Sequence, residues 1–187
     1  MLSISNAPVE DRILTAAASC VIDFGVERVT LAEIARRAGV SRPTVYRRWP
    51  DTRSVLAALL TSHITAALDD VPIRSSGRAA LVDRVVAVAA RLRGDELVMA
   101  VLRSELALVY IAQRLGSSQQ MLIDALAGDL RAAQRDGSVR RGDPRRLAAM
   151  VLLITQSTIQ SAEIVRPIMD AGALGAELAY SLNGYLS

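Results

Sequence analysis

The stretch that decides the fold of this chain is TLAEIARRAGVSRPTVYRRW, residues 30–49. Thr30 followed by Glu33 forms a capping box, in which each side chain satisfies a backbone N–H that the first turn of a helix leaves unpaired. Apolar residues then recur at helical spacing, at Leu31, Ile34, Ala35 and Ala38. The stretch therefore begins with a short amphipathic helix.

A glycine and a serine mark the turn into a second helix. Gly39 tolerates the positive φ angle that a sharp turn requires. Ser41 is a good N-cap, and Pro43 lies in the first turn of the second helix, where a missing N–H costs nothing. Pro50 ends this helix, and Asp51 can cap the next one. The pattern predicts two short helices joined by a tight turn.

The second helix has one basic and aromatic side. At 100° per residue Val45 points into the module, Thr44 flanks the outer side, and that side holds Arg42, Pro43, Tyr46 and Arg47. Between residues 36 and 53 the only charged residues are six arginines and Asp51, a local charge of +5 that a phosphate backbone attracts. This layout predicts a helix-turn-helix, which places one helix in the major groove of DNA.

An ordinary solvated pair of helices is the alternative, because a charge run is usually only a solvated face. Such a face needs no tyrosine and proline among its arginines. Nor does it need a capping box, a glycine turn and a second cap in fixed order. We therefore favour the DNA-binding interpretation.

The segment from Arg12 to Leu60 resembles the DNA-binding domain of TetR-type regulators, the tetracycline-repressor-like family. The residues that carry the resemblance are Phe24-Gly25, Thr30, Ile34-Ala35, Ala38-Gly39-Val40-Ser41, Thr44, Tyr46 and Trp49-Pro50. They cover about a quarter of the chain. One departure is Arg53, which stands where the family usually has a lysine at the start of its fourth helix; arginine keeps the charge but changes the geometry.

The resemblance implies roles for individual residues. Those expected to approach base edges are Arg42, Pro43, Thr44 and Arg47. Those expected to contact phosphate or to position the helix are Thr30, Ser41, Tyr46, Trp49 and Arg53. Double-stranded DNA is therefore the expected partner.

Helical periodicity continues along the whole chain, and the expected class is all-α. We place the helix-turn-helix domain at residues 1–50, with an ordered core at 9–50 and a connecting helix from 52. A larger helical regulatory and dimerisation domain takes residues 51–187. The expected helices outside the quoted stretch are Val9–Phe24, Thr52–Asp70, Arg78–Arg93, Asp95–Arg114 (broken), Ser118–Asp136, Pro144–Arg166 and Met169–Leu186.

The last two helices are candidates for self-association. Residues 147–154 are apolar nearly all round, so one face must meet something beyond its own neighbours. Burial within the monomer is the alternative. TetR-type proteins dimerise through their last two helices, so the resemblance implies a homodimer through about 144–166 and 169–186. Two recognition helices about 34–36 Å apart would read a palindrome.

The resemblance also implies a pocket for a small-molecule effector in the larger domain. The candidate lining residues are Met99, Leu102, Arg103, Leu106, Tyr110 and Met121, for each of which ordinary core packing is the alternative. Beyond residue 50 the chain has no Phe and no Trp. An aromatic cage for a cation is therefore poorly supported, and we expect an aliphatic or acyl-like effector and no other cofactor.

Composition excludes several other classes. One cysteine excludes an intramolecular disulfide, and with one histidine a His/Cys zinc site is excluded by count. We find no Gly-rich nucleotide motif, no H-E-x-x-H and no G-x-S-x-G, so the chain is not expected to be an enzyme.

The N-terminus resembles no signal peptide, and the apolar run at 147–154 is far shorter than the roughly 20 residues of a membrane span. We expect a bacterial cytoplasmic, nucleoid-associated regulator, most simply a ligand-responsive repressor. The alternative is a helix-turn-helix protein without a small ligand, controlled by its abundance or by a protein partner.

Overall fold

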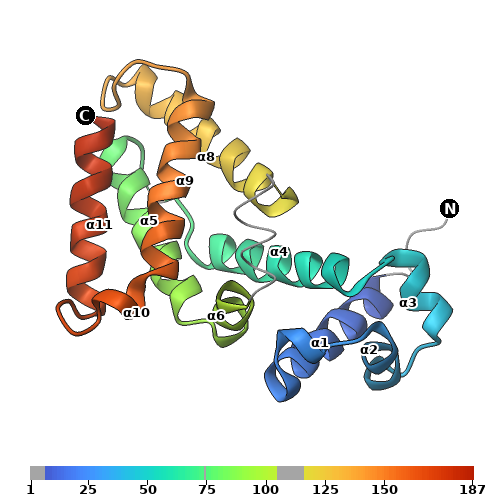
Figure 1. Cartoon of the computed structure of the whole chain (residues 1–187). Coiled ribbons are helices and arrows are strands. Elements are labelled where there is room, and N and C mark those ends of the chain that lie inside the picture. The colour runs from blue at the N-terminus through green and yellow to red at the C-terminus, as the bar shows by residue number, and fades with distance from the viewer. Residues whose placement is uncertain (1–6, 74, 105–115) are drawn as a thin grey trace, which may run out of the picture. The chain divides into compact units, whose positions relative to one another are not determined.

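The computed structural model describes residues 7–73, 75–104 and 116–187. Every regular element in these ranges is a helix (Figure 1), so the expected all-α class is confirmed. None of the described helices is long and apolar enough to cross a membrane. The described residues fall into two compact units: one comprises 7–63 and 96–104, and the other comprises 64–73, 75–95 and 116–187.

The first unit packs short helices around one apolar core. Its elements are α1 (Ala7–Phe24), the 3-10 turn η1 (Val26–Arg28), α2 (Leu31–Ala38), α3 (Arg42–Arg48), the first part of α4 (Thr52–Asp70) and α6 (Glu96–Arg103). α1 packs against α2 and α6, and α2 packs against α3. The core includes Ile13, Ala17, Cys20, Val21, Ile34, Val45, Trp49, Val55, Leu59, Leu97 and Val101.

The first part of α4 belongs to this core. Val55, Leu56 and Leu59 lie on one side of the helix and are buried with the residues of α1 and α2. The sequence places a domain boundary after residue 50, whereas packing joins the chain up to His63 to the N-terminal helices. α4 is thus one continuous helix that contributes residues to both units.

The chain's one cysteine and one tryptophan both lie in the core of the first unit. Cys20 is completely buried in α1, and burial raises the pKa of its thiol. Trp49 follows α3 and retains 6% of its exposure. Each behaves as a packing residue in the free protein.

The second unit is built from longer helices. Its elements are the last part of α4, α5 (Arg78–Arg93), α8 (Ser117–Arg135), α9 (Pro144–Gln160), α10 (Ala162–Val165) and α11 (Ala171–Leu186). α8 packs along α9, and α11 packs against α5 and α9 (Figure 1). The inward face of α11 is a row of leucines at i, i+4 spacing, namely Leu174, Leu178, Leu182 and Leu186.

Helix bounds follow the sequence expectation in most places. Thr52–Asp70 and Arg78–Arg93 are observed with the bounds expected. Of the helix expected over 95–114, Glu96–Arg103 is helical and residues 105–115 lie outside the described residues.

The prediction of a single helix over residues 144–166 is wrong. α9 ends at Gln160, and α10 is a separate short helix after Ser161. In the last turns of α9, Thr155 Oγ1 donates to the Val151 carbonyl at 2.7 Å and Thr158 Oγ1 donates to the Ile154 carbonyl at 2.8 Å. Such bonds from a side chain to the preceding turn weaken a helix slightly and often bend it. They contribute to the end of α9 but are not sufficient alone, because Thr61 makes the same bond within the unbroken α4.

Candidate nucleic-acid interface

α2 begins with half of the expected capping box. Thr30 is the N-cap, and its Oγ1 accepts a hydrogen bond from the Glu33 N–H at 3.2 Å. The Glu33 carboxylate turns instead to Arg36, at 2.7 and 2.8 Å, and to Arg37, at 2.9 Å. The prediction that the Glu33 carboxylate accepts a hydrogen bond from the Thr30 N–H is therefore wrong. A carboxylate binds a guanidinium more strongly than it binds a neutral amide.

The turn between α2 and α3 has the conformation expected from its glycine. Gly39 is left-handed, with φ 64° and ψ 37°, and closes α2 by donating its N–H to the Ala35 and Arg36 carbonyls. The next residue, Val40, is half-buried against the core. A residue with a Cβ would be strained at Gly39, so the direction in which α3 leaves α2 depends on this residue.

α3 begins at the expected cap. Ser41 is its N-cap, with Oγ accepting from the Thr44 N–H at 3.3 Å and lying 2.7 Å from the Thr44 hydroxyl. Pro43 lies in the first turn, as expected. Val45 is completely buried. This anchors one side of α3 in the core and leaves the other side outward.

The outer side of α3 carries the residues expected to meet DNA. Tyr46 retains 51% of its exposure, and Arg42, Pro43 and Arg47 are also exposed, while Thr44 is half-buried. Thr30, Ser41 and Arg53 are exposed near the same helices, at the starts of α2, α3 and α4 respectively. Trp49 differs from the rest of the expected set, because its ring is buried and serves to hold the end of α3.

Among the described residues, Arg48 is the arginine of α3 that contacts other side chains of the protein. Its Nη2 bonds the Glu10 carboxylate of α1, and its guanidinium lies 5.8 Å from the centre of the Trp49 ring. The basic side chains of α3 on the outer side are therefore Arg42 and Arg47. Asp51 Oδ1 caps α4 by accepting from the Ser54 N–H at 2.7 Å and from its hydroxyl at 2.6 Å, and these bonds lower the pKa of Asp51.

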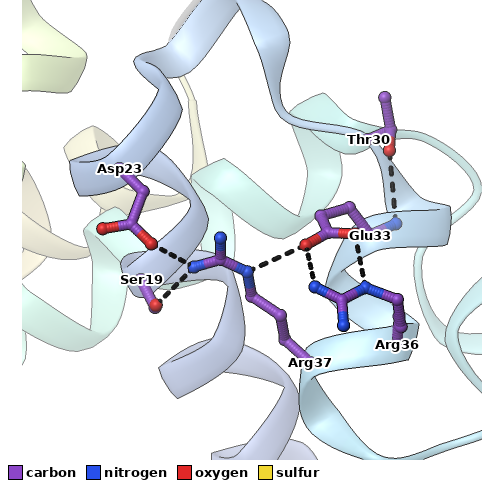
Figure 2. A network of polar contacts seen from close by, with 6 residues as sticks. All are labelled: Ser19, Asp23, Thr30, Glu33, Arg36 and Arg37. Atoms are coloured by element: carbon purple, nitrogen blue, oxygen red, sulfur yellow. Dashed lines mark hydrogen bonds and ion pairs between the residues drawn. The ribbon is translucent and has the colours of Figure 1, made fainter.

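A network of charged side chains joins α2 to α1 (Figure 2). Arg37 Nη1 donates to Ser19 Oγ at 2.6 Å and to Asp23 Oδ2 at 2.5 Å, while its Nε donates to Glu33. The guanidinium also lies 4.6 Å from the centre of the Phe24 ring. Hydrogen bonds from Arg36 and then Arg37 lower the pKa of Glu33 to about 2, so the Glu33 carboxylate is charged at neutral pH.

Sequence reasoning missed Arg12. This α1 side chain bonds the carbonyls of Ala38 and Gly39 at the turn of the helix-turn-helix. No local pattern signals the contact, because the acceptors are backbone oxygens 26 and 27 positions along the chain.

The residues expected to line an effector pocket are only partly described. Met99 is buried in α6, Leu102 is half-buried and Arg103 is exposed, all in the first unit. Met121 lies in α8 of the second unit, where Thr65 Oγ1 donates to its sulfur at 3.8 Å. Leu106 and Tyr110 lie outside the described residues. The pocket stays a prediction.

Comparison with known proteins gives the family. The family model "Bacterial regulatory proteins, tetR family" matches residues 13–59. An uncharacterized HTH-type transcriptional regulator of Mycobacterium bovis is 68% identical over the full length of both chains. The chain belongs to the TetR family. It is a DNA-binding helix-turn-helix transcriptional regulator, and the family is not enzymatic.

Solved TetR-type structures share the fold. The repressor QsdR of Rhodococcus erythropolis is 17% identical with a TM-score of 0.71, covering 95% of this chain and 94% of its own. The regulator FadR of Bacillus subtilis, solved in complex with stearoyl-CoA, is 20% identical with a TM-score of 0.70, covering 95% and 99%. These two likenesses extend the shared fold from the helix-turn-helix to 95% of the chain.

Proposed function

We propose that this TetR-family regulator is a repressor that binds a palindromic operator as a homodimer and releases it when a small molecule binds. The observation that carries the DNA part is the outer side of α3. Two exposed arginines and a tyrosine project there from a helix whose opposite side is buried at Val45. Guanidinium groups on a recognition helix suit both guanine edges and phosphates.

We assign the roles by position on α3 and at the helix starts. The residues proposed to approach base edges are Arg42, Pro43, Thr44 and Arg47. Tyr46 and Arg53 are proposed to contact phosphate, and Thr30 and Ser41 to contact phosphate while they cap their helices. The buried Trp49 positions the end of α3. Phosphate contacts would orient the helix, and base contacts would supply sequence preference.

Exposed apolar side chains on the last helices support the homodimer. Met150 and Leu153, three positions apart on α9, retain 41% and 57% of their exposure, and Tyr180 on α11 retains 79%. A contiguous patch of exposed apolar side chains marks an interaction surface, and α9 and α11 pack against each other. A second copy of the chain placed on α9 and α11 would cover them and would present two α3 helices to one duplex.

The effector is proposed to be aliphatic or acyl-like. The chain has no Phe or Trp beyond residue 50, and a protein of the same fold is solved with an acyl-CoA. The test is a thermal-shift series with fatty acids, acyl-CoA thioesters and aromatic cations. Stabilisation by the aromatic cations alone would refute the aliphatic class. If no compound in the series releases bound DNA, control by abundance or by a protein partner becomes the better account.

Selection of bound duplexes from random DNA tests the central proposal. We expect enrichment of a palindrome whose half-sites lie about one helical turn apart, about 10 base pairs. Sedimentation of the protein with the selected duplex should give two chains per duplex. Enrichment of no sequence would contradict operator recognition, and a pure monomer at micromolar concentration and on DNA would contradict the dimer. The expected cytoplasmic, nucleoid-associated location follows from the same role.

A further inference from the structure

α3 is too short to hold its own position. It has seven residues, and Val45 is its only buried side chain. Helices shorter than roughly 12 residues are marginal by themselves in water. Contacts at the two ends of α3 therefore add to the buried Val45 in setting the angle at which this helix meets a duplex.

Arg12 of α1 makes the contact at the turn before α3. Its Nε and Nη2 donate to the Ala38 carbonyl at 3.2 and 2.7 Å, and Nη2 also donates to the Gly39 carbonyl at 3.0 Å. Ala38 is the last residue of α2, so its carbonyl has no acceptor role within the helix. The planar fork of the guanidinium bridges both oxygens, which a lysine ammonium cannot do with the same geometry.

Glu10 of α1 makes the contact at the other end. Its carboxylate binds Arg48, the last residue of α3. The second turn of α1 thus holds the start of the turn into α3, and the first turn of α1 holds the end of α3. Both residues lie outside the part of the chain that the family model matches, which begins at Ile13.

We propose that Arg12 is a positioning residue for DNA recognition, which sets the direction of α3 through the Ala38 and Gly39 carbonyls. The inference rests on the proposed use of α3 to read base pairs. Without the bridge, the proposed phosphate contacts of Tyr46 and Arg53 remain, and α3 still carries Arg42 and Arg47. It no longer presents them at one fixed angle, so preference for the operator falls while attraction to any duplex remains.

The experiment compares Arg12→Met and Arg12→Lys with the matched control Arg28→Met in the full-length protein. Arg28 is also exposed in the first unit, and its Nε donates to the carbonyl of Phe24, four positions away. Affinity is measured for the duplex selected from random DNA and for an unrelated duplex, each across a range of salt. The melting temperature is recorded for every variant.

We expect Arg12→Met to lower the ratio of operator to unrelated affinity about tenfold relative to Arg28→Met, as loss of a well-made hydrogen bond would. The salt slope should equal that of the control. Arg12→Lys keeps the charge but should still lower the ratio of operator to unrelated affinity, by less than Arg12→Met does. If Arg12→Met does not fold, Arg12→Lys is the variant that tests the proposal.

Two results would overturn the proposal. A salt slope reduced by about one unit in Arg12→Met, restored in Arg12→Lys, would make Arg12 a phosphate contact. An unchanged ratio with only a lower melting temperature would make it a structural residue. If the wild-type protein itself prefers no duplex, the proposed function is wrong. If wild type prefers the operator and the Arg12 variants keep that preference, only the role of Arg12 is wrong.

Discussion

In both units arginine side chains join helices that are far apart in sequence, but they do so at different places. In the first unit, arginines join helices far apart in sequence: Arg12 reaches the turn after α2, and Arg37 reaches Ser19 and Asp23 of α1. In the second unit, Arg84 of α5 donates to the Leu68 and Val71 carbonyls at the end of α4, at 3.4 and 2.8 Å, and pairs with Asp129 of α8 at 3.3 Å.

Their surfaces differ as well. Among the described residues, the large apolar side chains exposed by more than half in the second unit are Leu153, Ile164, Ile168 and Tyr180, all on or beside the last three helices. In the first unit, Tyr46 on the proposed DNA face is the one exposed to that degree. The exposed apolar side chains of the second unit are those that the proposed second copy of the chain would cover.

The largest effect is expected from a substitution on the exposed apolar surface of the second unit. Leu153→Asp would bury an unpaired carboxylate in the proposed dimer, which should cost about 3–5 kcal/mol of association free energy. Sedimentation should then give monomers, and affinity for the palindrome should fall while a single half-site is bound as before. The control is Ala125→Asp, at an exposed position of α8. Dimers that persist in Leu153→Asp would place the interface elsewhere.

The next largest effect is expected from a substitution in the turn between α2 and α3 of the first unit. Gly39→Val puts a β-branched residue at φ 64°, and the free energy of unfolding should fall by about 2–3 kcal/mol. Gly128→Val is the matched control, because Gly128 lies within α8 and a Cβ there meets nothing within 4 Å. Thermal unfolding measures both. Equal stability of the two variants would show that the turn does not need its left-handed residue.

A smaller effect sharpens the division of roles on α3. Arg47→Ala should lose about 2 kcal/mol of preference for the operator over random DNA, as expected for a guanidinium on a guanine edge. Tyr46→Phe should weaken both duplexes about equally. Competition binding with the selected and unrelated duplexes gives both numbers. Equal weakening of all duplexes by Arg47→Ala would assign Arg47 to the phosphate backbone.

The smallest effect concerns the charged network in Figure 2. The pKa of Glu33 lies at about 2 in the folded chain against an ordinary value of 4.5, so its ion pairs stabilise the fold above pH 4.5 and are lost as the pH falls towards 2. Glu33→Gln should therefore be less stable than wild type at neutral pH, and the difference should vanish below pH 2. A difference that is constant from pH 7 to pH 2 would show that the carboxylate charge contributes nothing.

The parts of the fold that depend on nearby residues were predictable from the sequence. The caps at Thr30 and Ser41, the left-handed Gly39 and the buried side of α3 at Val45 all follow from spacing within a few positions. The resemblance of the helix-turn-helix motif supplied the family, and comparison confirmed it.

What was missed depends on competition or on distant partners. Glu33 chooses Arg36 and Arg37 over the Thr30 N–H, and Arg12 finds carbonyls 26 and 27 positions away. Apolar periodicity does not register the hydroxyl bonds of Thr155 and Thr158 near the end of α9, nor the break at Ser161 that follows them. Such contacts depend on which groups the folded chain brings together, and local sequence patterns do not contain that information.

Because Cys20 is buried, the rate at which its thiol is labelled can report how often the N-terminal core opens. A thiol reagent can reach this sulfur only when the N-terminal core opens, and the rest of the chain offers it no other target. When reclosing outpaces modification, the labelling rate reports the equilibrium for that opening. A duplex that binds only the closed form will slow the rate by mass action, so occupancy of DNA can be followed through a residue that never touches it.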